Sequence, residues 1–413
     1  MNKDEGGMSG EPDERDSVPL CRARDWLLQP AGPLAGTLLV LLLVARAVYV
    51  AMVSAGGGMD NAFVVRAAAS WLDGGAPYAD RRFLYLPSAV IAAAPQAMLP
   101  TSVVRIVVPL LVVAALTAGW ACALRIFDVA WRSRFAALGL LGIFLVWAPF
   151  EHLIHLGNWT VTAALALPLA LLLADRGRWP AAGAVVGAAI ALKPLLAPIV
   201  LLFVFARQWR ALGWMVAVPA AASVCAGLMM PDPSGFLTRT LPFLLRGGDA
   251  LMQPYDASAV AVLPRLGVPQ TVAVVVGAAA AAAGVVCAWR RWRRGDPGPA
   301  RLVETAVMLM LAAFLVSRPS YDHYLVVVVP LLLAGVLQPG AAARSPWFWV
   351  ALVPQVQGIT LPYLEGATRR AFKDFITLCA LAATVGVHCA RARPSRPPGY
   401  PETRQVSLCD RSF

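Results

Sequence analysis

The stretch 34–53, LAGTLLVLLLVARAVYVAMV, decides the fold class of this chain. Its length matches the roughly 20 apolar residues that a helix needs to cross the hydrocarbon core of a membrane. It is too long for a signal sequence and has no small-residue cleavage site, so we expect it to persist as a first span. Of the whole chain, 59% is hydrophobic and 14% charged, with a mean hydropathy of +0.66. The sequence therefore predicts an all-α polytopic membrane protein.

Further apolar stretches predict about twelve transmembrane helices in total. They lie near 34–53, 103–124, 136–150, 160–174, 181–192, 195–206, 213–229, 269–289, 302–316, 324–337, 347–361 and 372–390. The transmembrane domain then covers 34–390, between a disordered tail at 1–33 and a disordered basic tail at 391–413.

The arginines decide the predicted orientation, because positively charged residues favour cytoplasmic loops. Placing most of them inside puts both termini in the cytoplasm and leaves two long outer loops, 54–102 and 230–268. The proline-rich stretch 83–99 then becomes an outer juxtamembrane or re-entrant helix. The net charge of +12 fits this membrane topology, so we expect no nucleic-acid partner. The sequence predicts a multi-pass protein of the cell membrane.

Lys193 is the lysine that falls within an apolar region, at Lys193-Pro194 between 181–192 and 195–206. Basic residues before and after this region favour an even number of crossings, and Pro194 supplies the break. Whether two full spans or a re-entrant hairpin results stays open. A lone ammonium at such a break suits a phosphate, and the alternative is that Lys193 reaches to the membrane surface.

Asp60 follows the first apolar stretch directly after a run of three glycines. The residues Ala62, Val65, Ala69 and Leu72 recur at helical spacing, which predicts an amphipathic helix at the membrane surface. A carboxylate at the rim of a membrane is costly to keep, which makes Asp60 a candidate general base. The alternative is that Asp60 caps this helix by accepting backbone hydrogen bonds.

The segment 317–324, SRPSYDHY, separates two later apolar stretches. Asp322 and His323 form a titratable pair, and Arg318 has the fork geometry that binds phosphate oxygens. The alternative is a structural network within the loop.

Glu151 and His155 have the spacing of two metal ligands on one helix. No third ligand stands at a suitable spacing, so the sequence predicts no metal site, and we expect no cofactor.

Several of these patterns belong together. They are Asp60 with WLDGGAPY (71–78) and FLYLP (83–87), LGNWT (156–160), ALKP (191–194) and SRPSYDHY (317–324). In order and spacing the chain resembles the polyprenol-phosphate-mannose-dependent mannosyltransferases of glycosyltransferase family 87, within the C-type membrane glycosyltransferase superfamily. The resemblance covers nearly all of 34–390.

This resemblance implies an inverting transfer of a hexose, mannose first, from a polyprenyl-phosphate sugar to a lipid or glycan acceptor on the outer face of the membrane. Asp60 matches the general base, with His323 as a second catalytic group. The donor phosphate would be bound by Lys193 and Arg318. The remaining substrate-binding candidates are Tyr85, Asn158, His155 and Asp322.

Two other functions stay open. An arabinofuranosyltransferase that uses polyprenyl-phosphate arabinose would share these features. A transporter or flippase of lipids or sugars should instead show an inverted repeat and polar residues near the membrane midplane. No convincing repeat is found, and the polar residues gather at one predicted rim.

Overall fold

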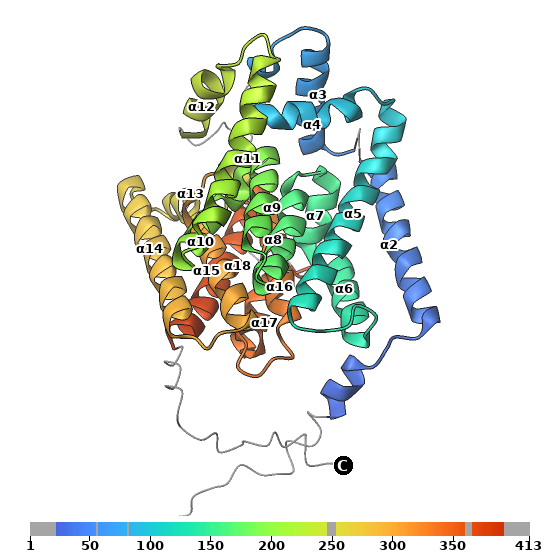
Figure 1. Cartoon of the computed structure of the whole chain (residues 1–413), viewed down its shortest axis with the longest axis vertical. Coiled ribbons are helices and arrows are strands. Elements are labelled where there is room, and N and C mark those ends of the chain that lie inside the picture. The colour runs from blue at the N-terminus through green and yellow to red at the C-terminus, as the bar shows by residue number, and fades with distance from the viewer. Residues whose placement is uncertain (1–21, 55–56, 81, 246–252, 360–365, 392–413) are drawn as a thin grey trace, which may run out of the picture.

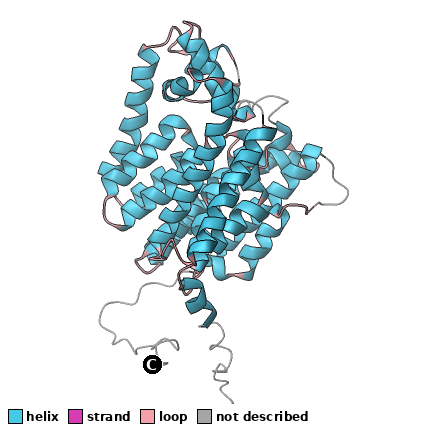
Figure 2. Cartoon of the chain, turned by 90° about the vertical axis from the view of Figure 1, so that its right-hand side faces the viewer, coloured by secondary structure: helices cyan, strands magenta, loops and turns pink. Residues whose placement is uncertain are grey.

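A computed structural model describes residues 22–54, 57–80, 82–245, 253–359 and 366–391. Throughout these residues the regular structure is helical, with two isolated bridges, Pro30 to Ser133 and Trp147 to Val356. Most long helices run along the longest axis of the molecule (Figure 1), and the side view shows the same bundle (Figure 2). The predicted all-α architecture is confirmed.

Long apolar helices form the frame of the bundle. Six described helices are long and apolar enough to cross a membrane: α2 (Pro33–Val53), α5 (Thr101–Ile126), α11 (Trp209–Leu228), α14 (Gln270–Arg294), α15 (Pro299–Val316) and α18 (Gly366–Ala390). Their outer faces expose large apolar side chains, such as Leu41 at 59% and Val275 at 65%. Such faces are stable against lipid and not against water. The chain is a multi-pass membrane protein.

The other predicted spans coincide with shorter helices. Three are α6 (Arg134–Val146), α8 (Thr160–Asp175) and α9 (Trp179–Leu192). The rest are broken into a 3₁₀ and an α segment: η2 with α10 (Pro194–Ile199, Val200–Phe205), η5 with α16 (Asp322–Val327, Val329–Ala334), and α17 with η7 (Pro346–Leu352, Val353–Gln355). Each predicted stretch thus contains helix within the described residues, while the number of twelve crossings stays a prediction.

The helical conformation is interrupted between α9 and η2. Lys193 is extended, with φ −151° and ψ 121°, and η2 then packs back against α9. Proline lacks a backbone N–H and disfavours the helical conformation in the residue before it, so Pro194 ends α9. The break holds the Lys193 side chain at a helix end, where it can point into the protein.

The upper end of the molecule in Figure 1 holds α3 (Met59–Leu72) and α4 (Pro87–Ala97), which pack on each other. The helices predicted after Asp60 and within 83–99 are present as α3 and α4, while their position at the membrane surface stays a prediction. The face of α3 that is buried in the protein differs from the predicted membrane-surface stripe of Ala62, Val65, Ala69 and Leu72, which stays a prediction. Its buried residues are Asn61, Val64, Ala67 and Ala68, because this face packs on α4.

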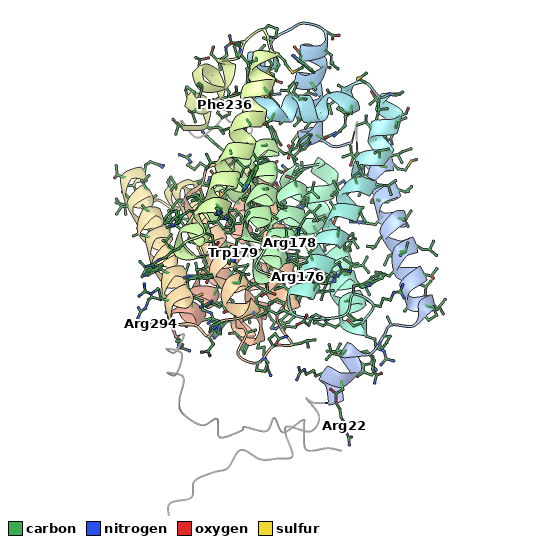
Figure 3. All side chains as sticks on the ribbon, viewed as in Figure 1. Arg22, Arg176, Arg178, Trp179, Phe236 and Arg294 are labelled. Atoms are coloured by element: carbon green, nitrogen blue, oxygen red, sulfur yellow. The ribbon has the colours of Figure 1, made fainter. Side chains whose placement is uncertain are left out.

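The segments outside the bundle are partly structured. Residues 22–28 of the predicted N-terminal tail are helical, and the Ala31 nitrogen donates a hydrogen bond of 2.7 Å to the Arg132 carbonyl. Residues 1–21 and 392–413 of the predicted tails lie outside the described residues. The loop 230–268 carries η3 (Phe236–Thr240), α12 (Leu241–Leu245), η4 (Gln253–Tyr255) and α13 (Ala259–Arg265). Figure 3 shows Phe236 at the upper end and Arg22 and Arg294 at the lower end.

Candidate active site

A cavity of about 250 Å³ lies where α3, the break after α9, the loop 317–321 and α12 meet. Five of the predicted site residues line it: Asp60, Tyr85, Asn158, Lys193 and Arg318. These residues lie far apart in the sequence, and the fold brings them together in one cavity.

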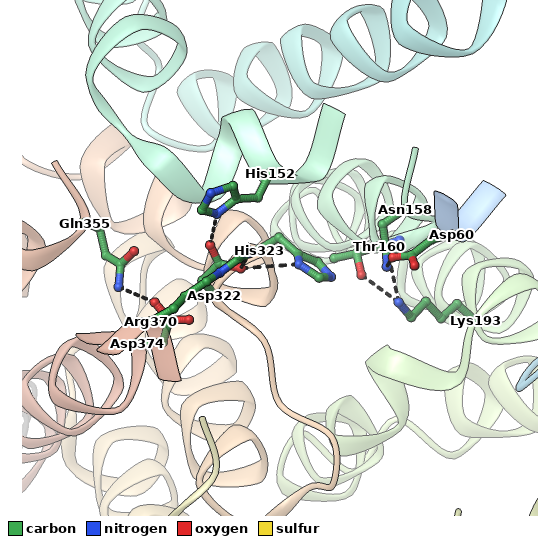
Figure 4. A network of polar contacts seen from close by, with 10 residues as sticks. All are labelled: Asp60, His152, Asn158, Thr160, Lys193, Asp322, His323, Gln355, Arg370 and Asp374. Carbon is green, nitrogen blue, oxygen red and sulfur yellow. Dashed lines mark hydrogen bonds and ion pairs between the residues drawn. The ribbon is translucent and has the colours of Figure 1, made fainter. Parts of the chain in front are cut away.

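Asn158 joins the carboxylate and the ammonium of this cavity (Figure 4). Its amide nitrogen donates a hydrogen bond of 2.5 Å to Asp60 Oδ2, and its amide oxygen accepts one of 2.7 Å from Lys193 Nζ. Lys193 Nζ also donates to Thr160 Oγ1 at 2.9 Å. Asp60 and Lys193 are therefore held on opposite ends of a single neutral side chain, close together yet without a direct ion pair.

A tight backbone crossing fixes Asp60 beside Asn158. Gly58 has a φ of 102° and Gly157 a φ of 59°. A Cβ atom on Gly58 would overlap the backbone of Leu156 and Gly157, and one on Gly157 would overlap the Gly57 carbonyl oxygen. Only glycine combines this close approach with a positive φ. The start of α3 is thereby locked onto the chain segment that carries Asn158.

The alternative roles of the two charged residues do not hold. The N-cap of α3 is Gly58, without a side-chain capping bond, and the carboxylate of Asp60 instead accepts from Asn158. Lys193 does not reach to the surface, since its ammonium lies 5.0 Å from the centre of the Tyr324 ring and 5.9 Å from that of Tyr85. Both charges point into the cavity, and aromatic faces stabilise the cation there.

Arg318 also lines the cavity, on a loop held by Asp256. The buried carboxylate of Asp256 accepts hydrogen bonds from the backbone nitrogens of Ser258 (2.9 Å) and Ser320 (3.0 Å), and lies 3.7 Å from Arg318 Nε. Burial raises the pKa of Asp256, and the backbone donors and Arg318 partly offset that rise. Asp256 thus orients the arginine loop from outside the cavity.

Arg82 also lines the cavity, and the sequence analysis missed it. Its backbone nitrogen donates to Asp80 Oδ1 at 2.9 Å, and its guanidinium lies 5.9 Å from the centre of the Phe63 ring. The signal was present, because Arg82 directly precedes the FLYLP stretch that contains Tyr85. With Lys193 and Arg318 it makes three cations around one space.

Asp322 and His323 lie behind this cavity rather than on its wall. Asp322 is 2% exposed and bonds to His152 Nδ1, while Arg370 Nη2 donates to it at 3.1 Å. Its oxygens are thus occupied by the protein, which favours the structural network over a substrate contact. The buried His323 lies 3.4 Å from Asp322, and Figure 4 shows its ring directed toward Thr160.

His155 lies outside the cavity. Its Nδ1 is 3.2 Å from Ser54 Oγ, and its Nε2 is 3.5 Å from Glu151 Oε1. Within the described residues, no three His, Cys, Asp or Glu side chains are grouped as metal ligands would be.

Comparisons with known proteins bear directly on this cavity. The family model "Glycosyltransferase family 87" matches residues 83–317, which include Tyr85, Asn158 and Lys193 and exclude Asp60, Arg82 and Arg318. An alpha-(1->3)-arabinofuranosyltransferase of Mycobacterium tuberculosis H37Rv is 28% identical over 281 residues, and one of Mycolicibacterium smegmatis is 27% identical over the same length. These alignments cover 67% of this chain, and 63% and 64% of the two relatives.

No solved structure matches the chain. The family model covers more than half of the chain, and it confirms the resemblance inferred from the sequence patterns. The chain belongs to glycosyltransferase family 87.

Proposed function

We propose that this protein transfers an arabinofuranosyl residue from a polyprenyl phosphate to a glycan or lipid acceptor. The family supports sugar transfer, and the curated relatives are alpha-(1->3)-arabinofuranosyltransferases. The first expectation from the sequence, a hexose and above all mannose, has no support among these relatives. The arabinofuranosyltransferase that the sequence left open is therefore the better reading.

The observation that carries this proposal is the pairing of Asp60 and Lys193 through Asn158. Sugar transfer from a phosphate needs a base for the incoming hydroxyl and positive charge for the leaving group. Here the two lie a single side chain apart, so both can reach one sugar bound in the cavity.

In the proposed reaction the acceptor hydroxyl attacks the anomeric carbon from the face opposite the phosphate. Its oxygen forms the new bond, the bond from that carbon to the phosphate oxygen breaks, and Asp60 takes the hydroxyl proton. Inversion follows from this single displacement. The hydrogen bond from Asn158 keeps one carboxylate oxygen fixed, which leaves the other for the hydroxyl.

The phosphate would lie among Lys193, Arg82 and Arg318. A phosphate monoester leaves as a stable anion, so cations suffice and no strong acid is required. The apolar lining from Phe63 and Leu244 suits the first isoprene units of the lipid. His323 does not line this cavity. It would instead support the cavity wall from behind, between Asp322 and Thr160.

We place this reaction on the extracytoplasmic side of the membrane. The support is the arginine distribution in the sequence, with Arg294 and Arg22 at the end of the molecule opposite Phe236 (Figure 3).

The test uses the full chain in proteoliposomes with radiolabelled polyprenyl-phosphate arabinofuranose or polyprenyl-phosphate mannose and a mycobacterial-type arabinan acceptor. We expect label from the arabinose donor on the acceptor, and none from the mannose donor. Transfer of mannose alone would overturn the choice of sugar. Movement of the labelled lipid across the bilayer without transfer would instead indicate a flippase.

A further inference from the structure

A second hollow, of about 370 Å³, lies on the other side of the first turns of α3. Its lining consists of Ser54, Gly58, Met59, Ala62, Arg66 and His155. The proposed donor cavity shares none of these residues, so the hollow is a separate space with no role assigned so far.

The helix α3 is the wall between the two spaces. Met59, Ala62 and Arg66 face the hollow, while Asp60 and Phe63 face the donor cavity. Residues three and four apart share a face of a helix, so these sets form two neighbouring stripes. Asp60 therefore stands at the border between the spaces.

Two polar side chains of the lining, Ser54 after α2 and His155 of α7 (Ala148–Leu156), continue into a series of polar contacts behind the hollow. Ser54 Oγ contacts His155 Nδ1 at 3.2 Å, and His155 Nε2 lies 3.5 Å from Glu151 Oε1. Arg46 Nη2 forms an ion pair of 2.5 Å with the same Glu151 oxygen. Arg46 lies on the candidate membrane span α2, where an ionisable group is expensive to keep, and none of these groups lines the proposed donor cavity.

The lining offers the hydrogen bonds that a saccharide needs. The exposed Arg66 supplies donors, while Arg46, behind the hollow, is paired with Glu151. Ser54 and His155 offer both donors and acceptors, as sugar hydroxyls require. Met59, which is 53% exposed, and Ala62 supply apolar surface for the C–H faces of a sugar ring. The volume lies in the range of ligand pockets.

We infer that this hollow is the acceptor subsite, which binds hydroxyl groups of the glycan that receives the sugar. The inference rests on the proposed function, since it requires the acceptor hydroxyl to reach Asp60. A glycan in the hollow extends over the start of α3 and presents one hydroxyl at the border. The donor enters from the other side, so the two substrates meet at Asp60 without sharing a pocket.

The test measures binding without catalysis. The probe is the octyl glycoside of an arabinofuranosyl disaccharide, titrated into the detergent-purified full chain. The variants are Ser54→Ala and His155→Phe, with Arg178→Gln, an exposed residue outside both spaces, as the control. Thermal unfolding shows whether each variant is folded. Ser54→Ala removes a single hydroxyl group, so we expect this variant to fold.

We expect the Kd of the glycoside to rise about fivefold for each hydrogen bond lost. Binding of polyprenyl monophosphate should stay as in the wild type for all variants. The inference is overturned if wild-type protein does not bind the glycoside, if Ser54→Ala and His155→Phe bind it normally, or if they lose polyprenyl monophosphate equally.

Failure of the proposed function would look different. Glycoside binding that Ser54→Ala weakens, in a protein that transfers no sugar from either donor, would support a saccharide site and overturn the transfer reaction.

Discussion

The two ends of the molecule hold buried charge in different ways. At the lower end, Glu304 is 3% exposed and receives a hydrogen bond of 2.7 Å from Arg291 Nε, one of 2.9 Å from the Ala342 nitrogen, and a contact of 3.2 Å from His388. At the proposed donor cavity, Lys193 Nζ donates to the neutral Asn158 and Thr160. The charge of Glu304 is balanced by partners within the protein, whereas the charge of Lys193 faces a cavity.

This difference separates structural charge from charge kept for a ligand. A buried carboxylate that is surrounded by donors ties helices together. The Lys193 ammonium has neutral hydrogen-bond partners, and Arg82 and Arg318 line the same cavity. The positive charge there can therefore attract an anionic ligand. Changes at the lower end should therefore affect stability, and changes at the cavity should affect catalysis.

The largest expected effect is that of Asp60→Asn. Loss of the base should lower the kcat of sugar transfer about 10²- to 10⁴-fold, while the protein stays folded. Asp73→Asn is the matched control, because Asp73 ends the same helix and is exposed. Initial rates with labelled donor measure both. Full activity of Asp60→Asn would remove Asp60 from the base role.

The lower end should respond in the opposite way. Glu304→Gln leaves Arg291 without its charged partner, which should lower the free energy of unfolding by about 3 kcal/mol. Transfer rates below the unfolding temperature should not change. Thermal unfolding in detergent measures the stability, and initial rates measure the transfer. A lower kcat without lower stability would contradict a purely structural role for Glu304.

A smaller effect should follow at the crossing that positions Asp60. Gly58→Ala places a Cβ against the backbone of Leu156 and should cost about 1–3 kcal/mol of stability, together with part of the activity.

The matched control is Gly74→Ala, with a φ of 78° but no atom within 4 Å of its Cβ. It carries the strain of a positive φ without the contact, so it should retain activity. Equal activity in Gly58→Ala and Gly74→Ala would show that the crossing does not position Asp60.

Much of the fold was predictable because hydrocarbon-length apolar stretches and prolines act locally. The break at Lys193-Pro194 is an example, as is the helix that begins beside Asp60. The face of α3 was not predictable, since its packing on α4 decides which residues are buried.

The site was predictable where a polar residue interrupts an apolar stretch, as Lys193 does. The burial of Asp322 behind the cavity was not predictable, because its partners, His152 and Arg370, are 170 and 48 residues away in sequence. Arg82 was missed because a basic residue beside an apolar stretch is usually a flanking residue.

The most direct measurement of the central claim is the affinity of the purified protein for polyprenyl monophosphate, the proposed leaving group. Lys193→Gln should raise its Kd about tenfold or more, since one charge-assisted contact is lost. Arg294→Gln, which removes an exposed charge at the lower end, should leave the Kd unchanged. Equal affinity of Lys193→Gln and the wild type would contradict the claim that this cavity holds the donor phosphate.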